Sequence, residues 1–229
     1  MTSKNFAALA ALATVVAAHG NITSPPARTP GPAMAAACGQ PAVDSALSDG
    51  TTPLEDIDMS AATASCQLSL CRGATFEDNR ANVQTYSAGQ TIRMLAQLPI
   101  PHEGPMNVSI VDTSTNTVIG EPLIEFASYA DENLPALPAN NTDFSVTMPQ
   151  LADGQCAQAG QCTIQWFWFG TKAQQTYESC VDFVMASANA SAMTSAATSA
   201  TGSAVPAADA SSGTASGFSF VYRARRFRV

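Results

Sequence analysis

The sequence predicts an all-β protein, an antiparallel β-sandwich with long N-terminal loops. Its apolar segments are short, and they are rich in β-branched or aromatic residues. Pro, Gly, Asn or Asp bounds most of them, as expected where strands end in turns. No long helical period competes with these segments, although residues 61–70 could form a short helix. Several short strands separated by turns are typical of a sandwich.

Six segments of strand length are expected to build the two sheets. In chain order they are Thr91–Leu98, Asn107–Val111, Thr117–Ile119, Asp143–Met148, Cys162–Phe169 and Cys180–Met185. Together with the loops that precede them, they occupy residues 19–185, a length at which one hydrophobic core forms. We therefore expect a single domain over this range.

Both ends of the chain differ from this domain. Residues 1–18 place Lys4 ahead of an apolar run that ends in small residues, which predicts a secretory signal peptide cleaved after Ala18. The run is too short to span a bilayer, so the mature protein is expected to be secreted and extracellular. Residues 186–229 are rich in Ser, Ala and Thr, which predicts a disordered tail. Four arginines near its end argue against a lipid-anchor signal and leave open a polybasic tail or a misread gene boundary.

The chain contains six cysteines, and this even number in a secreted protein predicts three disulfides. Spacing alone leaves the pairing open. We expect the close pairs Cys66–Cys71 and Cys156–Cys162, which leaves Cys38 to pair with Cys180. No CxxC spacing supports a thiolate metal site instead.

The formal net charge is −8, with few charged residues overall. This balance argues against a nucleic-acid partner and against docking on acidic membranes, and it favours a neutral partner. Asn21, Asn107, Asn140 and Asn189 each begin a glycosylation sequon, so a glycoprotein is expected wherever these residues are exposed. A glycan on Asn21 would lie two residues from His19.

The chain has only two histidines, and signal cleavage would make His19 the first residue of the mature protein. A terminal histidine offers its α-amine and a ring nitrogen to the same metal, and the amine has an ordinary pKa of about 8. His102 would add a third nitrogen from the rigid turn LPIPHEGPMN. Nitrogen sites of this kind favour copper. The alternative is an ordinary loop histidine.

A third element is the pattern Q-x-Y-x-x-C, formed by Gln175, Tyr177 and Cys180 ahead of the last strand. Alternation in an extended segment places Gln175 and Tyr177 on one face, while Cys180 can be held by a disulfide. Tyr177 could then approach a copper ion axially, and Gln175 could hydrogen-bond an oxygen species there. The alternative is a core tyrosine beside a disulfide.

Four pieces of the sequence together resemble a fungal lytic polysaccharide monooxygenase with a chitin-binding type 4 domain, closest to auxiliary activity family sixteen. They are HGNITSPPARTPGPAMAAACG, IPHEGPMNVSIVDTSTNTVIGEPL, CTIQWFWF and QTYESCVDF. The terminal histidine and Q-x-Y-x-x-C are shared widely among such enzymes, whereas SPPAR and AACGQ are typical of a narrower group of them.

The resemblance implies an immunoglobulin-like or fibronectin-III-like sandwich with a flat copper face. It makes His19 and His102 a histidine brace for one copper ion, with Tyr177 as the axial residue and Gln175 as a polar group beside it. It further implies an external electron donor with O2 or H2O2 as co-substrate. The substrate would be an insoluble β-1,4-linked polysaccharide, cellulose first and chitin second, and the protein a monomer.

Four other residues belong to the same pieces of sequence. Gln165 is a weaker candidate than Gln175, since its side chain could face the other side of its strand. Trp166 and Trp168 are expected in the core. Arg28 would either contact substrate or brace the N-terminal loop.

Two other functions remain compatible with this pattern. A copper-binding or copper-delivery protein could keep the brace without oxidising polysaccharide, but such a protein is expected to alter Tyr177 or Gln175. A non-catalytic carbohydrate-binding module should show exposed aromatics on a flat face, and this chain has few aromatic residues.

Overall fold

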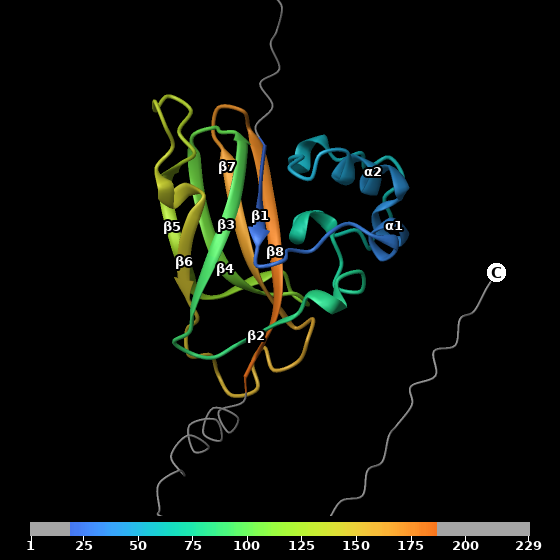
Figure 1. Ribbon diagram of the computed structural model, residues 1–229. Helices are drawn as coiled ribbons and strands as arrows, with labels where there is room; N and C mark the ends of the chain where they lie inside the picture. Colours follow the sequence, from blue (N-terminus) through green and yellow to red (C-terminus); the bar gives the residue numbers. More distant parts are fainter. Residues whose placement is uncertain (1–18, 187–229) are drawn as a thin grey trace, which may run out of the picture.

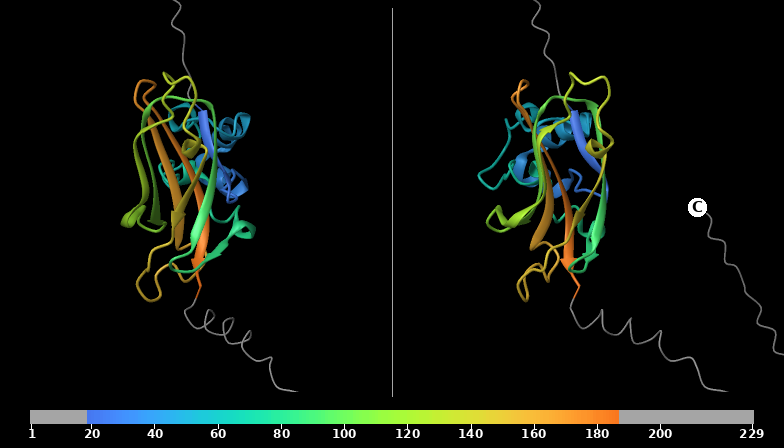
Figure 2. Two further views of the ribbon diagram at one scale, coloured as in Figure 1. Left: turned by 60° about the vertical axis from the view of Figure 1, so that its left-hand side comes forward. Right: turned by 90° about the vertical axis from the view of Figure 1, so that its left-hand side faces the viewer.

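The computed structural model describes residues 19–186, so the predicted signal peptide and residues 187–229 of the predicted tail lie outside the described residues. Two β-sheets face each other, and short helices lie beside one of them (Figures 1 and 2). The elements are β1 (His19–Ser24), α1 (Pro32–Cys38), α2 (Gln40–Ser48), η1 (Leu54–Asp56), η2 (Cys71–Gly73), η3 (Arg80–Asn82), β2 (Gln84–Tyr86), β3 (Thr91–Ile100), β4 (Gly104–Asp112), β5 (Thr117–Tyr129), η4 (Ala139–Asn141), β6 (Asp143–Thr147), β7 (Cys162–Gly170) and β8 (Gln175–Met185).

The smaller sheet has the strand order β1-β3-β6 and the larger one β2-β8-β7-β4-β5. All neighbouring strands are antiparallel except β2 and β8, which run parallel. This confirms the prediction of a mostly β fold with two sheets. All six predicted strands are present, and β1 and β2 are additional. Neither of these two has an apolar run that could have predicted it, because one reads HGNITS and the other is three residues long.

The core lies between the two sheets and is rich in aromatic rings. Trp166 and Trp168 on β7 are fully buried, which confirms that both are core residues. Trp168 lies opposite Tyr177 in the β7–β8 register, and their rings stack with centroids 4.6 Å apart. Tyr129 packs edge-on against both tryptophans. These contacts make β7 and β8 the rigid centre of the fold.

The outer face of β8 is also covered, because the long segment between β1 and β2 packs against it (Figure 1). Polar residues on this face are paired. The Glu178 carboxylate accepts a hydrogen bond from the Arg72 amide at 3.0 Å. The Asp182 carboxylate pairs with Arg28 at 2.6 Å. Strand β8 is therefore buried on both sides, and its buried charges have partners.

Two short helices in this segment were not predicted. A glycine precedes both α1 and α2, and a proline follows it within two residues, an arrangement that suits a helix start. The Asp78 carboxylate accepts hydrogen bonds from two amides in the first turn of α1. The short helix expected at residues 61–70 is wrong, since this stretch consists of turns. No helix among residues 19–186 is long and apolar enough to cross a membrane.

All six cysteines form disulfides, as predicted, but two of the three pairings were wrong. Cys156 pairs with Cys162, whereas Cys38 pairs with Cys66 and Cys71 with Cys180. The expected Cys66–Cys71 bridge does not form because Cys71 packs against the outer face of β8, where Cys180 lies. Cys66 instead reaches the end of α1 at Cys38.

Candidate metal centre

His19 begins β1 and lies opposite Ile100, the last residue of β3. The next residue, Gly20, sits where no side chain fits. A Cβ atom at Gly20 would lie 2.9 Å from Leu98 Cδ2 and 3.0 Å from Trp168 Cζ3. The glycine thus lets β1 approach the core closely, and this packing holds His19 at the end of the sandwich.

His102 follows Ile100 by two residues, in the short connection between β3 and β4. It is only 5% exposed, and the structure gives its buried Nδ1 no hydrogen-bond partner. Both backbone groups of Glu103 hold this connection in place. The Glu103 amide donates to the Glu132 carboxylate at 2.7 Å, and the Glu103 carbonyl accepts from the Thr171 amide at 2.9 Å. His102 thus lies on a loop between two strands, as its sequence context predicted.

Gln175 and Tyr177 lie at the start of β8, and both side chains are buried on the face that meets the core. The Tyr177 hydroxyl donates to Gln175 Oε1 at 2.9 Å. Burial raises the pKa of Tyr177, and the nearby carboxylates of Glu55, Asp56 and Asp49 raise it further. Tyr177 therefore stays a neutral phenol at physiological pH.

Strand pairing brings these four residues to one end of the sandwich. His19 lies beside the end of β3, from which His102 follows after one intervening residue. Gly170, the last residue of β7, pairs with Gln175, and a Cβ atom on it would lie 3.3 Å from the His102 Cβ. Figure 1 shows this end, where β1 begins and the turn between β7 and β8 lies.

One residue at this end was missed by the sequence analysis. Asp49 Oδ2 lies 3.3 Å from His19 Nε2, and Asp49 follows α2 directly. A hydrogen bond from the Thr51 side chain holds the pKa of Asp49 below its usual value. No sequence signal could have found it, because Asp49 lies 30 positions from His19 in an ordinary turn sequence.

Gln165 does not join this group. It pairs with Cys180 in the β7–β8 register, and alternation places both on the face opposite Trp168 and Tyr177. This agrees with the expectation that Gln165 faces the other side of its strand. Gln175 is therefore the glutamine beside Tyr177.

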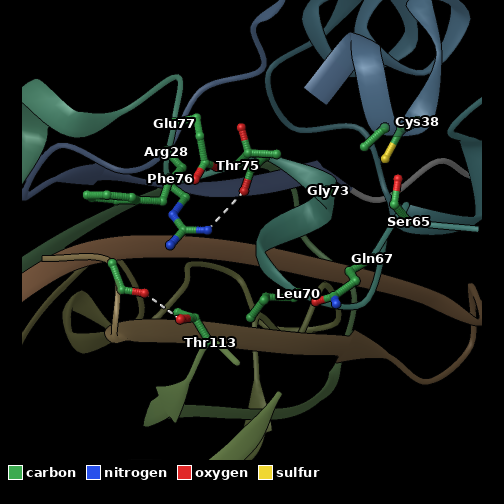
Figure 3. Close-up of a pocket in the computed structure, with 13 residues that line it drawn as sticks. Arg28, Cys38, Ser65, Gln67, Leu70, Gly73, Thr75, Phe76, Glu77 and Thr113 are labelled. Carbon is green, nitrogen blue, oxygen red and sulfur yellow. Dashed lines mark hydrogen bonds between the residues drawn. The ribbon is translucent and has the colours of Figure 1, made fainter. Parts of the chain in front are cut away.

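The structure also separates the two roles left open for Arg28. Its guanidinium lines the pocket of Figure 3, and there it donates to the Ala74 carbonyl at 3.1 Å. The same group forms two hydrogen bonds to Asp182, and the two side chains are only 4% and 1% exposed. Arg28 thus braces the N-terminal loop on β8. None of the four site residues lines this pocket.

The donor atoms at this end fit a metal held by nitrogen. Among the described residues no cluster of three or more His, Cys, Asp or Glu side chains could hold a metal ion. A site of two imidazoles and one amine needs no such cluster. The buried Nδ1 of His102, which has no protein partner, is the kind of polar atom that calls for a ligand.

Comparison with known proteins gives one family match. A family model described as "Lytic polysaccharide mono-oxygenase, cellulose-degrading" matches residues 19–183. No curated protein matches the chain.

Three of the similar solved structures illustrate the range of likeness. A lytic polysaccharide monooxygenase of Jonesia denitrificans has 16% identity and a TM-score of 0.38, with 73% of this chain and 100% of that chain covered. A chitin binding domain from Burkholderia pseudomallei has 13% identity and a TM-score of 0.41, covering 74% and 100%. A Bacillus amyloliquefaciens CBM33 in complex with Cu(I) has 11% identity and a TM-score of 0.32, covering 45% and 56%. At these TM-scores the likenesses carry no argument, and the family match is the finding that counts.

Proposed function

The chain belongs to the lytic polysaccharide mono-oxygenase family over residues 19–183, and we propose that it is a secreted copper enzyme that cleaves β-1,4-linked polysaccharide oxidatively. The observation that carries the proposal is that the chain's only two histidines lie at the same end of the sandwich. The family's description as cellulose-degrading supports cellulose as the first substrate. Chitin is the second.

Each residue at this end has a proposed role. The α-amine and imidazole of His19 and the imidazole of His102 would hold one copper ion as a histidine brace. Tyr177 would lie beside the copper ion as a neutral phenol, because its raised pKa keeps the hydroxyl protonated. Gln175 would orient the Tyr177 hydroxyl through the 2.9 Å hydrogen bond, and its amide would be available to hydrogen-bond the oxygen co-substrate.

The proposed chemistry divides between the metal and the protein. Copper, when bound, would supply one-electron chemistry with O2 or H2O2 at the expense of an external electron donor. The protein holds both imidazoles on backbone that is fixed by strand pairing and by the clamped Glu103 amide and carbonyl. Such rigidity keeps the ligands in place through the reaction. An insoluble substrate would meet this end as a surface.

The proposal includes the maturation of the chain. Cleavage after Ala18 would leave His19 with the α-amine that the brace requires, and residues 1–18 lie outside the described residues. The remaining expectations belong to the same proposal: secretion, a monomer, a domain ending near residue 185 with a tail after it, an immunoglobulin-like or fibronectin-III-like sandwich, fungal origin and closeness to auxiliary activity family sixteen.

Glycosylation is proposed at one of the four sequons. Asn140 is exposed in the short 3-10 helix η4, where an oligosaccharide can attach. Asn107 lies inside β4 between two paired strands, and Asn21 uses its side-chain amide to donate to the Gly50 carbonyl at 3.1 Å. Asn189 lies outside the described residues.

One observation bears on the rival functions. The large hydrophobic side chains exposed on the described residues are aliphatic, namely Leu47, Ile100, Val118 and Leu134. A carbohydrate-binding module that stacks sugars on aromatic rings would need a different surface. A copper carrier stays the stronger rival, and activity separates it from the enzyme.

The deciding experiment measures oxidised products. Protein that begins at His19 is loaded with copper, mixed with ascorbate and incubated with phosphoric-acid-swollen cellulose or β-chitin, and the soluble fraction is analysed by mass spectrometry. Oxidised oligosaccharides are expected. Tight copper binding without any oxidised product would overturn the enzyme and support the copper carrier.

A second measurement tests the brace itself. His102→Ala should lower copper affinity by more than about 100-fold, beyond the loss seen when only an outer partner of a ligand is removed. Glu103→Ala is the matched control, since Glu103 holds the loop through its backbone and not through its side chain. Unchanged affinity in the His102 variant would rule out the brace.

A further inference from the structure

The carboxylate of Asp49 points at the proposed terminal ligand, with Oδ2 3.3 Å from His19 Nε2. We propose that Asp49 is a positioning residue that keeps the proton of the His19 ring on Nε2. The lone pair then lies on Nδ1, the ring nitrogen that a terminal histidine must present to copper. The inference rests on the proposed function, because it assigns a role relative to the copper ion.

Ring geometry explains why the tautomer matters. The α-amine and Nδ1 of one histidine close a six-membered chelate ring with a metal, whereas Nε2 lies on the far side of the imidazole. A neutral imidazole carries its single proton on one nitrogen, and a hydrogen-bond acceptor at Nε2 selects the tautomer with the proton there. Carboxylates play this part beside many metal-binding histidines.

The Asp49 carboxylate is itself oriented. Oδ1 accepts two hydrogen bonds from Thr51, one from its amide at 3.0 Å and one from its hydroxyl. Because both of these donors hold the same oxygen, Oδ2 is left to face His19. The orientation is therefore a property of the turn and does not depend on His19.

The turn that carries Asp49 is anchored to the sandwich by a buried arginine. Arg72, which is 9% exposed, donates from Nη1 to the Gly50 carbonyl at 2.8 Å and to the Thr52 carbonyl at 3.1 Å. Asn21, on the same strand as His19, also donates to the Gly50 carbonyl. Strand β1 and the turn after α2 are thereby tied together, side by side as Figure 1 shows.

Two substitutions of Asp49 should act in opposite ways on the His19 tautomer. In Asp49→Asn the Thr51 donors keep an oxygen at the Oδ1 position, so the new amide N–H group faces His19 and donates to Nε2. This moves the ring proton to Nδ1, where it blocks copper. Asp49→Ala removes the carboxylate and its preference for a proton on Nε2, but it places no N–H donor there in its stead. Asp49→Asn should therefore impair copper binding more than Asp49→Ala does.

The tautomer can be read directly in copper-free protein. Long-range proton–nitrogen NMR spectra at pH 8, where histidine side chains in water are neutral, distinguish protonated from unprotonated ring nitrogens. The chain has two histidines, so His102 serves as an internal reference. The wild type is expected to carry the proton on Nε2 of His19, Asp49→Asn on Nδ1, and Asp49→Ala a mixture.

Copper affinity then follows the same order. Both variants should bind Cu(II) more weakly than wild type, within the roughly 10- to 100-fold range for lost outer partners of a ligand, with Asp49→Asn the weaker. Asp44→Asn removes another carboxylate of the same helical region, one that pairs with Gln40, and should leave affinity and tautomer unchanged.

The outcomes separate this inference from the proposed function. Wild-type protein that begins at His19 and yet binds no copper overturns the proposed function. If the wild type binds copper, two results overturn the role of Asp49. One is the same His19 tautomer in the wild type and both Asp49 variants, and the other is a lower copper affinity for Asp49→Ala than for Asp49→Asn. A purely structural loosening of the turn would make Asp49→Ala the weaker copper binder, because alanine removes more contacts than asparagine does.

Discussion

Removal of the Arg28 guanidinium should destabilise the fold strongly, although Arg28 lines a pocket. Its side chain is 4% exposed and that of Asp182 is 1% exposed. Arg28→Met keeps most of the side-chain length but leaves the Asp182 carboxylate buried without its cation. Breaking a buried pair in this way costs about 3 to 5 kcal/mol of the free energy of unfolding.

The chain offers a matched control for this prediction. Arg93 also donates through Nε and Nη2 to both oxygens of one carboxylate, that of Asp143, but the two side chains are 66% and 45% exposed. Arg93→Met should change the free energy of unfolding far less than Arg28→Met does, because water solvates the charge that is left behind. The two variants differ mainly in burial.

The assay is urea unfolding of the disulfide-intact protein, followed by tryptophan fluorescence. With a slope of about 2 kcal/mol per molar urea, Arg28→Met should lower the midpoint by roughly 1.5 to 2.5 M. Replacing both partners, as in Arg28→Met with Asp182→Leu, should recover much of the loss. Equal losses for Arg28→Met and Arg93→Met would refute the reasoning, and a loss of substrate binding at unchanged stability would show that Arg28 contacts substrate.

Two further predictions concern the disulfides and the loop beside His102. Removing Cys71–Cys180, whose cysteines lie 109 positions apart, should cost about 5 kcal/mol of the free energy of unfolding by chain entropy. Removing Cys156–Cys162, with a separation of 6, should cost only about 2 kcal/mol. Denaturation of the two double-alanine variants measures the difference. The Glu103 amide lowers the pKa of Glu132 from 4.5 to about 2, so the ionised carboxylate stabilises the fold above pH 4.5 and this contribution is lost as the pH falls toward 2. The advantage of wild type over Glu132→Gln in free energy of unfolding should therefore shrink from pH 5 to pH 3, and a constant advantage would contradict the assignment.

Six of the eight strands were predictable because each of these six has a local signal. Segments such as Cys162–Phe169 combine β-branched and aromatic residues over the length of one strand, and the turns beside them contain Pro, Gly or Asp. The helices were not predictable in the same way. Both α1 and α2 are shorter than ten residues, and their apolar cluster is small. Their stability depends on packing against neighbouring loops, which a periodicity does not reveal.

The disulfide pairing shows the same limit. Proximity in sequence favoured Cys66–Cys71, but Cys71 is held against β8 by the neighbouring contact between the Arg72 amide and Glu178. That contact joins residues 106 positions apart, and only the folded chain brings them together.

The sequence by itself determined the mostly β fold, the family and the candidate ligands His19 and His102, because each depends on residue types in a local pattern. The fold brings both histidines to one end of the sandwich, since the pairing of β1 with β3 sets His19 beside the strand end that leads to His102. It also decided which partners surround them. Asp49 faces His19, and Arg28 turns away to Asp182, because the long segment after β1 folds back over β8. Contacts between residues so far apart in the chain leave no mark in local sequence.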